Sequence, residues 1–156
     1  MAMEETIADR ISTRFPELKE KIQISRARRI FVDPPEANFN ELCEFAYDEL
    51  EFISLVSIVG TDEGENLGAM YILAADNGVL LGIRRYQPRE NPVLNTLTHR
   101  FPNAEYYEKE LVDMFGFRVD GLPPGPRYPL PDDWPEGQYP LRKDWKPEML
   151  KNSAGA

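Results

Sequence analysis

Two segments near the start of the chain have apolar residues at helical spacing. The first predicts an amphipathic helix over residues 3–15 that ends at Pro16, because proline disfavours the continuation of a helix. The second predicts a helix from Asn38, a good N-cap residue with Glu41 three residues later. The apolar stripes of the two helices consist of Ile7, Ile11 and Phe15, and of Phe39, Leu42, Cys43, Ala46 and Leu50.

Five segments have the alternating or continuous apolar pattern of β-strands. We expect residues 52–59 in the middle of the sheet, because this run is almost entirely apolar and rich in Ile and Val. We expect a type I′ turn at Asp76-Asn77-Gly78, because Asn and Gly tolerate positive φ. The predicted strands are residues 22–24 and 30–32, which form a hairpin, and residues 52–59, 67–75 and 79–86.

The simplest architecture that buries these stripes is an α+β two-layer sandwich, a mainly antiparallel sheet with helices on one face. Beyond the sheet, Pro92 is expected to start a short helix that extends through Leu97. Asn103 is expected to cap a further helix over residues 104–115, which ends at Gly116. On that helix Glu110 and Asp113 are predicted to share one face with Tyr106, so that the acids are displayed.

The end of the chain differs in composition from the rest. Residues 119–147 contain eight of the fourteen prolines and both tryptophans. We therefore divide the chain into an α+β domain, residues 1–118, and an extended Pro-rich C-terminal arm, residues 119–156. Aromatic side chains often dominate binding interfaces and proline limits the entropy lost on ordering, which favours a partner-binding arm. An arm that wraps its own domain and a disordered tail are the alternatives.

Composition and charge exclude several classes of protein. A net charge of -9 disfavours nucleic-acid binding, and the one dense basic cluster, Arg26, Arg28 and Arg29, is more often a solvated hairpin face than an anion site. With one cysteine, Cys43, and one histidine, His99, the chain contains no internal disulfide and no Cys-based zinc or iron-sulfur site. The N-terminal stretch lacks the apolar core of a secretory signal, so we expect a cytoplasmic protein.

An ordered set of motifs lies between residues 104 and 145. It comprises Glu108-Lys109-Glu110, Asp113-Met114-Phe115-Gly116, then Gly121, Pro123 and Arg127, an acidic turn that contains Trp134, and Pro140-Leu141-Arg142-Lys143-Asp144-Trp145. These residues resemble the 30 kDa subunit family of respiratory complex I, the NADH dehydrogenase. The same domain recurs in membrane-bound energy-converting nickel-iron hydrogenases and in formate hydrogenlyases. The resemblance extends from about Pro34 onward.

The chain departs from the family pattern at three places. Lys109 stands where the family usually has arginine, Leu122 stands where it has histidine, and Pro126-Arg127 replaces a pair of arginines. Residues 134–140 look closer to the hydrogenase and formate hydrogenlyase branch.

The resemblance implies a cofactor-free, non-catalytic subunit in the peripheral arm of a respiratory oxidoreductase. Such a subunit docks on the large catalytic subunit, which forms the quinone pocket or holds the nickel-iron centre, and lies beside an iron-sulfur subunit. It is peripheral on the cytoplasmic face of the membrane and meets the membrane only through the complex. The partner interface is predicted at Glu108, Glu110, Asp113, Phe115, Arg127, Trp134, Pro140, Leu141, Arg142, Lys143, Asp144 and Trp145.

Two other functions are compatible with the residues. A free-standing adaptor would use the Pro-rich tail as a ligand, although the tail has fixed Trp and Arg-Lys-Asp positions in place of Pro-x-x-Pro repeats. A carboxylate-based hydrolase would use Glu105, Glu108, Glu110 and Asp113. Acids on one short helix rarely bracket a substrate from two sides, which disfavours the hydrolase.

Overall fold

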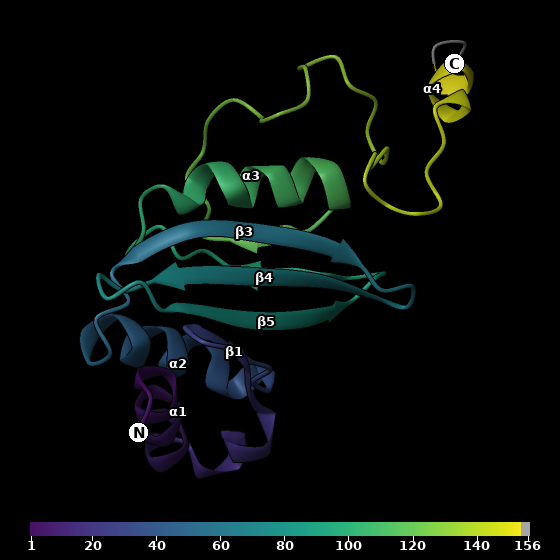
Figure 1. The fold of residues 1–156 in the computed structure, drawn as a ribbon. Helices are drawn as coiled ribbons and strands as arrows, with labels where there is room; N and C mark the ends of the chain where they lie inside the picture. Colours follow the sequence, from purple (N-terminus) through teal and green to yellow (C-terminus); the bar gives the residue numbers. More distant parts are fainter. Residues whose placement is uncertain (154–156) are drawn as a thin grey trace. The chain divides into compact units, whose positions relative to one another are not determined.

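A computed structural model describes residues 1–153, which form two compact units (Figure 1). The first unit contains Met1–Ile58 and Ala69–Arg85, and the second contains Val59–Gly68 and the chain from Tyr86 onward. Three long strands, β3 (Ser54–Asp62), β4 (Asn66–Ala74) and β5 (Leu80–Pro88), continue from one unit into the other.

The predicted first helix and hairpin are confirmed in the first unit. The hairpin is antiparallel and places Ile22 opposite Val32. The buried side chains Ile7 and Ile11 lie on the inner face of the first helix, as their spacing requires. The elements are α1 (Met3–Arg14), a 3₁₀ helix over Pro16–Lys21, β1 (Ile22–Arg26), β2 (Arg29–Val32) and α2 (Glu36–Asp48).

The five-stranded sheet has the order β1-β2-β5-β4-β3. β2 pairs with β5 in parallel, whereas β3, β4 and β5 alternate in direction (Figure 1). The mainly antiparallel α+β class is therefore confirmed. The prediction that residues 52–59 lie in the middle of the sheet is wrong, because β3 is an edge strand. The apolar run predicted a central strand, but only part of it is buried: Leu55 and Ile58 are buried, whereas Val56 and Val59 are 46% and 37% exposed.

Helix α2 packs its apolar stripe against the sheet of the first unit. The ring of Phe39 lies 4.9 Å from that of Tyr71, and the guanidinium of Arg85 lies 4.1 Å from the centre of the Phe39 ring. Cys43 is buried in the same core, as expected, and burial raises the pKa of its thiol. This thiol therefore stays protonated and unreactive.

Two local predictions in the first unit are wrong. Helix α2 begins at Glu36, after Pro35, and the Asn38 amide lies inside the helix and donates to Glu17 Oε1 at 2.6 Å. Proline suits the start of a helix, so the turn begins earlier than the capping pattern indicated. The β4–β5 turn is not type I′, because Gly78 has φ 81° but Asn77 is not in the positive-φ region.

The second unit contains α3 (Ala104–Phe115) and a pair of short parallel strands, β6 (Val93–Asn95) and β7 (Arg118–Asp120). The predicted helix over residues 92–97 is therefore wrong. Its backbone is held by β7 instead, since Arg118 N–H donates to Pro92 O at 2.8 Å. The ends of α3 are confirmed, with Gly116 at φ 80°, although Asn103 occupies the N-cap position without a capping side-chain bond.

Residues 121–147 contain no helix or strand and are followed by α4 (Glu148–Ser153). We refer to residues 121–151 as the C-terminal segment. Among residues 1–153, no helix combines the length and the apolar character that a membrane crossing requires.

Candidate partner-docking site on α3 and the C-terminal segment

Glu108 lies on the inner side of α3 and is completely buried. Its carboxylate accepts hydrogen bonds from Leu97 N–H at 2.7 Å and from Thr96 Oγ1 at 2.6 Å. Burial raises the pKa of Glu108, and these two bonds oppose that shift. The side chain thus connects α3 to the loop after β6, within its own chain.

Asp113 is also buried, with 5% of its surface exposed, so the prediction that this acid is displayed is wrong. Its carboxylate binds the Arg127 guanidinium at 3.1 Å and accepts Leu130 N–H at 3.0 Å. Arg127 also donates to Trp134 O at 3.3 Å. Asp113 faces the C-terminal segment, and its charge is neutralised there, because a buried carboxylate requires a partner.

Phe115 is the third predicted site residue that proves to be buried, at 5% exposure. Its ring lies over Gly60, where an added Cβ would come within 2.4 Å of the ring. The next residue, Gly116, has φ 80° and is approached so closely by Tyr139 that a Cβ would lie 2.6 Å from that ring. The end of α3 is therefore packed on both sides.

The C-terminal segment returns to α3 through backbone oxygens. Leu141 N–H donates to Met114 O at 3.0 Å, and Arg142 Nε donates to Phe115 O at 2.6 Å. The Arg142 guanidinium lies 4.6 Å from the centre of the Tyr139 ring, and burial lowers the pKa of this group. These contacts fix the path of residues 139–142 over the last turn of α3.

A cluster around Asp62 holds the following residues of the segment. Asp62, at the end of β3, accepts hydrogen bonds from Arg89 Nη1 at 2.6 Å, Lys143 N–H at 2.8 Å and Gly64 N–H at 2.9 Å. Arg89 also binds Asp144 at 2.5 Å. The hydrogen bond from Arg89 is the main reason that the pKa of Asp62 lies well below its usual range. Sequence analysis missed Asp62 and Arg89, because no local pattern connects residues so far apart.

The two tryptophans of the segment lie side by side, with ring centres 6.1 Å apart. Gln138 joins them: Trp134 Nε1 donates to its backbone oxygen at 2.8 Å and Trp145 Nε1 to its side-chain oxygen at 2.7 Å. Both indoles and Pro140 are half-buried. The two indoles and Gln138 thus hold residues 134–145 of the segment together.

The outer face of α3 presents apolar surface. Tyr106 is 61% exposed and lies edge-on to the 47% exposed Tyr128, with ring centres 5.7 Å apart. Half-exposed Glu110 lies one helical turn from Tyr106 and lines a cavity of about 260 Å³ with both tyrosines. We call Tyr106, Glu110 and Tyr128 the tyrosine patch. Tyr106 and Tyr128 were not among the predicted interface residues.

The predicted interface residues thus divide by burial. Glu108, Asp113 and Phe115 are buried within the chain; Glu110, Arg127, Trp134, Pro140, Arg142 and Trp145 are half-buried; Leu141, Lys143 and Asp144 are exposed.

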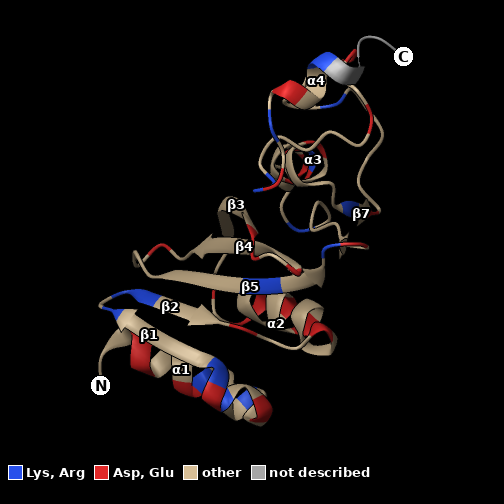
Figure 2. Cartoon of the chain, turned by 90° about the vertical axis from the view of Figure 1, so that its right-hand side faces the viewer, with Lys and Arg blue, Asp and Glu red and all other residues tan. Residues whose placement is uncertain are grey.

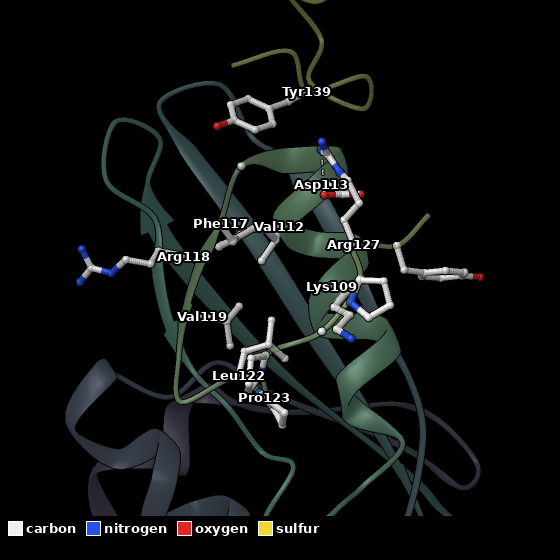
Figure 3. Close-up of a pocket in the computed structure, with 15 residues that line it drawn as sticks. Lys109, Val112, Asp113, Phe117, Arg118, Val119, Leu122, Pro123, Arg127 and Tyr139 are labelled. Carbon is white, nitrogen blue, oxygen red and sulfur yellow. Dashed lines mark hydrogen bonds and ion pairs between the residues drawn. The ribbon is translucent and has the colours of Figure 1, made fainter. Parts of the chain in front are cut away.

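A larger cavity of about 580 Å³ lies between α3, β7 and the proline-rich start of the segment (Figure 3). Arg127 points toward Asp113 in this cavity, whereas Arg118 points away from it (Figure 3). Lys109 pairs with Glu105 at 2.6 Å. Lys109 and Arg127, the two cationic side chains on the α3 side, are thus already engaged with carboxylates.

The arrangement does not resemble a hydrolytic pair of carboxylates. Glu108 is bound to Thr96 and Leu97, and Asp113 to Arg127, so each is committed to a structural contact. Over the described part of the chain, no three His, Cys, Asp or Glu side chains form a group that could hold a metal ion.

Comparison with known proteins identifies the class of protein to which this fold and these α3 motifs belong. The chain belongs to the family described as respiratory-chain NADH dehydrogenase, 30 kDa subunit, whose model matches residues 32–149. The family resemblance carried by the motifs is confirmed.

Individual relatives come from several complexes. The chain is 35% identical to the membrane-bound hydrogenase subunit beta of Pyrococcus furiosus, over 98% of this chain and 94% of that protein. It is 32% identical to a subunit of the F420H2 dehydrogenase of Methanosarcina mazei, over 90% of each. A chain in the structure of the membrane-bound sulfane sulfur reductase, an archaeal respiratory membrane complex, matches the fold with a TM-score of 0.80 at 22% identity, covering 97% of this chain and 91% of that one.

Proposed function

We propose that this chain is a non-catalytic, cofactor-free subunit of a membrane-associated respiratory oxidoreductase or energy-converting hydrogenase. It docks on the large catalytic subunit, beside an iron-sulfur subunit, at the cytoplasmic face of the membrane. The similarity over nearly full length to a hydrogenase subunit and to a dehydrogenase subunit supports this role. The chain reaches the membrane only through the complex.

The observation that carries the docking role is the exposed tyrosine patch on α3. Tyr106 and Tyr128 are large apolar side chains at the surface, and tyrosine is enriched among residues that dominate binding energy. Glu110, which lines the same cavity, supplies a charge for orientation, and Leu141, 48% exposed, adds apolar surface from the segment.

The C-terminal segment acts as the partner-binding arm in this proposal. Its inner residues, Arg127 and Arg142, bind α3, which leaves Leu141, Lys143 and Asp144 at the surface. Because the segment is held before binding, less conformational entropy is lost when the complex forms.

Co-expression with the large catalytic subunit tests the docking role. The double variant Tyr106→Ala/Tyr128→Ala should lower the affinity by at least about tenfold, since two interface aromatics are removed. Tyr86→Ala is the matched control, because Tyr86 is 48% exposed in the same unit but lies on β5. Undiminished co-purification of the double variant, with its thermal midpoint unchanged, would refute the docking role of the patch.

Metal and pigment analysis tests the absence of a cofactor. The purified full chain should contain no stoichiometric iron or nickel and show no absorbance in the visible range. One iron or nickel per chain would overturn this part of the proposal.

A further inference from the structure

The sheet of the first unit has an outer face, opposite the face on which α2 packs. Along β4 and β5 the side chains alternate, so that Tyr71 and Ile83 are buried, while Met70 and Ile72 are half-exposed on the other side. Phe31 of β2 belongs to this outer face as well, since its ring lies over Gly82 of β5. A groove of about 410 Å³ runs over these residues.

The groove crosses the strands instead of following one of them. Its lining comes from β1, β2, β5 and β4, which are neighbours in the sheet in that order. At about 4.8 Å between strands, four strands span roughly 14 Å. A segment of about ten helical residues covers that distance, so the groove fits a helix that lies on the sheet as an added layer.

The mouth of the groove is basic. Arg26 and Arg29 line it, and Arg28 lies in the turn between β1 and β2, which Figure 2 shows in blue. Within residues 1–153, no carboxylate forms an ion pair with these three side chains. By contrast, Arg84 and Arg85 on β5 pair with Asp33 and Glu36.

The conformation of Arg28 adds an independent observation. Its φ is 60°, a region in which glycine or asparagine is less strained than arginine. The turn thus places an exposed guanidinium at a position where glycine or asparagine would give a more stable fold. Backbone strain of this kind is concentrated at functional positions.

We propose that this groove, with its basic mouth, binds an acidic amphipathic helix of a partner protein. Apolar side chains of the helix occupy the groove over Phe31, Met70 and Ile72, and its carboxylates face Arg26, Arg28 and Arg29. Charge complementarity selects this occupant, because the only dense basic cluster of a chain with charge -9 lies at the mouth of an apolar groove. This surface belongs to the first unit, whereas the tyrosine patch belongs to the second.

Binding of two synthetic peptides to the full ¹⁵N-labelled chain tests the proposal. Both have about 14 residues and, when helical, present leucine at i, i+3, i+4 and i+7 on one face, and the other positions are glutamate in one and lysine in the other. The glutamate peptide should shift the amide signals of Phe31, Met70 and Gly82 and bind at least about tenfold more tightly than the lysine peptide. The net charge of -9 attracts the lysine peptide, so this preference requires a local basic site.

Variants separate binding from folding. Arg26→Glu/Arg28→Glu should lower the affinity for the glutamate peptide at least about tenfold. Arg118 is an exposed arginine of the second unit, and Arg118→Glu should change that affinity by less than about twofold. Arg28→Gly should also weaken binding although it raises the thermal midpoint, because it removes the charge and relieves the positive φ.

Three results would overturn the proposal. They are no binding of the glutamate peptide at millimolar concentration, signal shifts confined to α3 or the C-terminal segment, and equal binding of the two peptides. Vesicles of phosphatidylglycerol are tested in parallel. If they bind and the peptides do not, and if Arg26→Glu/Arg28→Glu abolishes vesicle binding, the surface recognises a membrane and the proposed protein partner is wrong.

Discussion

The carboxylate of Asp62 accepts a hydrogen bond of 2.8 Å from the backbone N–H of Lys143, which lies 81 residues further along the chain. The same carboxylate binds Arg89. Asp62→Asn retains one acceptor but loses the charge, so we expect the free energy of unfolding to fall by about 2 kcal/mol at pH 7. Urea unfolding measures this loss. The side chain of Asp144 is 73% exposed, so Asp144→Asn should lower the free energy of unfolding by less than about 1 kcal/mol. Equal losses for the two variants would contradict the view that Asp62 is the carboxylate that stabilises this cluster.

The pH dependence of that difference has a defined sign. The pKa of Asp62 is lowered in the folded state, so its contribution is complete above the unfolded pKa of about 3.9 and is lost as the pH falls toward the folded value. The stability difference between wild type and Asp62→Asn should therefore be constant from pH 7 to about pH 5 and shrink below it. A difference that remains constant down to pH 3 would contradict the role of the ionised carboxylate.

Glu108 is expected to respond to pH in the opposite direction. Its pKa is raised by burial, so its protonation stabilises the fold as the pH falls, and the gain is complete below the unfolded pKa of about 4.3. Glu108→Gln stays neutral at every pH. Its free energy of unfolding should lie within about 1 kcal/mol of the wild-type value at pH 7 and should not rise as the pH falls. Glu108→Ala should lose about 2 kcal/mol, because Leu97 N–H then remains buried without an acceptor. Similar losses for Gln and Ala would show that the hydrogen bonds contribute little.

The contact between Gly60 and Phe115 leaves no room for a methyl group. Gly60→Ala should lower the free energy of unfolding by about 2 kcal/mol, since the new Cβ would meet the ring at 2.4 Å. Adding Phe115→Leu should recover part of this loss, and a double-mutant cycle measures the coupling. Strictly additive losses would show that the strain is relieved elsewhere.

We expect the protein to be more stable with glycine than with arginine at position 28. Its φ of 60° costs roughly 1–2 kcal/mol for a side-chain residue, and glycine loses about 0.5–1 kcal/mol through its greater freedom when unfolded. Arg28→Gly should therefore raise the free energy of unfolding by about 0.5–1 kcal/mol. Arg26→Gly in the adjacent strand is the control and should lower it. If both substitutions destabilise the protein, the turn is not strained.

Local patterns were sufficient for elements whose burial repeats along the chain. Helix α1, the β1–β2 hairpin and the ends of α3 could be predicted, because their apolar spacing and the Gly116 stop signal are contained in a few neighbouring residues. The position of a strand within the sheet could not be predicted from such local patterns. An apolar run such as that of β3 has the same pattern whether its exposed face meets a second layer, a partner or solvent.

The site shows the same division. The motif residues around α3 were found, but their orientation was not. Asp113 was assigned to the displayed face because the sequence did not reveal that Arg127 would cover it. The Asp62 cluster joins three distant parts of the chain, and nothing in residues 60–64 indicates that Arg89 and Lys143 will meet there. Tyr106 and Tyr128 became candidates only through their exposure and mutual contact.

Two contacts of the C-terminal segment with α3 depend on the length of that helix. The oxygens that receive Leu141 and Arg142 are main-chain atoms of Met114 and Phe115, which every amino acid supplies. Inserting one residue into α3 would turn these oxygens by about 100° around the helix axis and leave the returning chain without acceptors. The number of residues in α3 is therefore a structural requirement in its own right, alongside the side chains of Asp113 and Phe115 in its final turn.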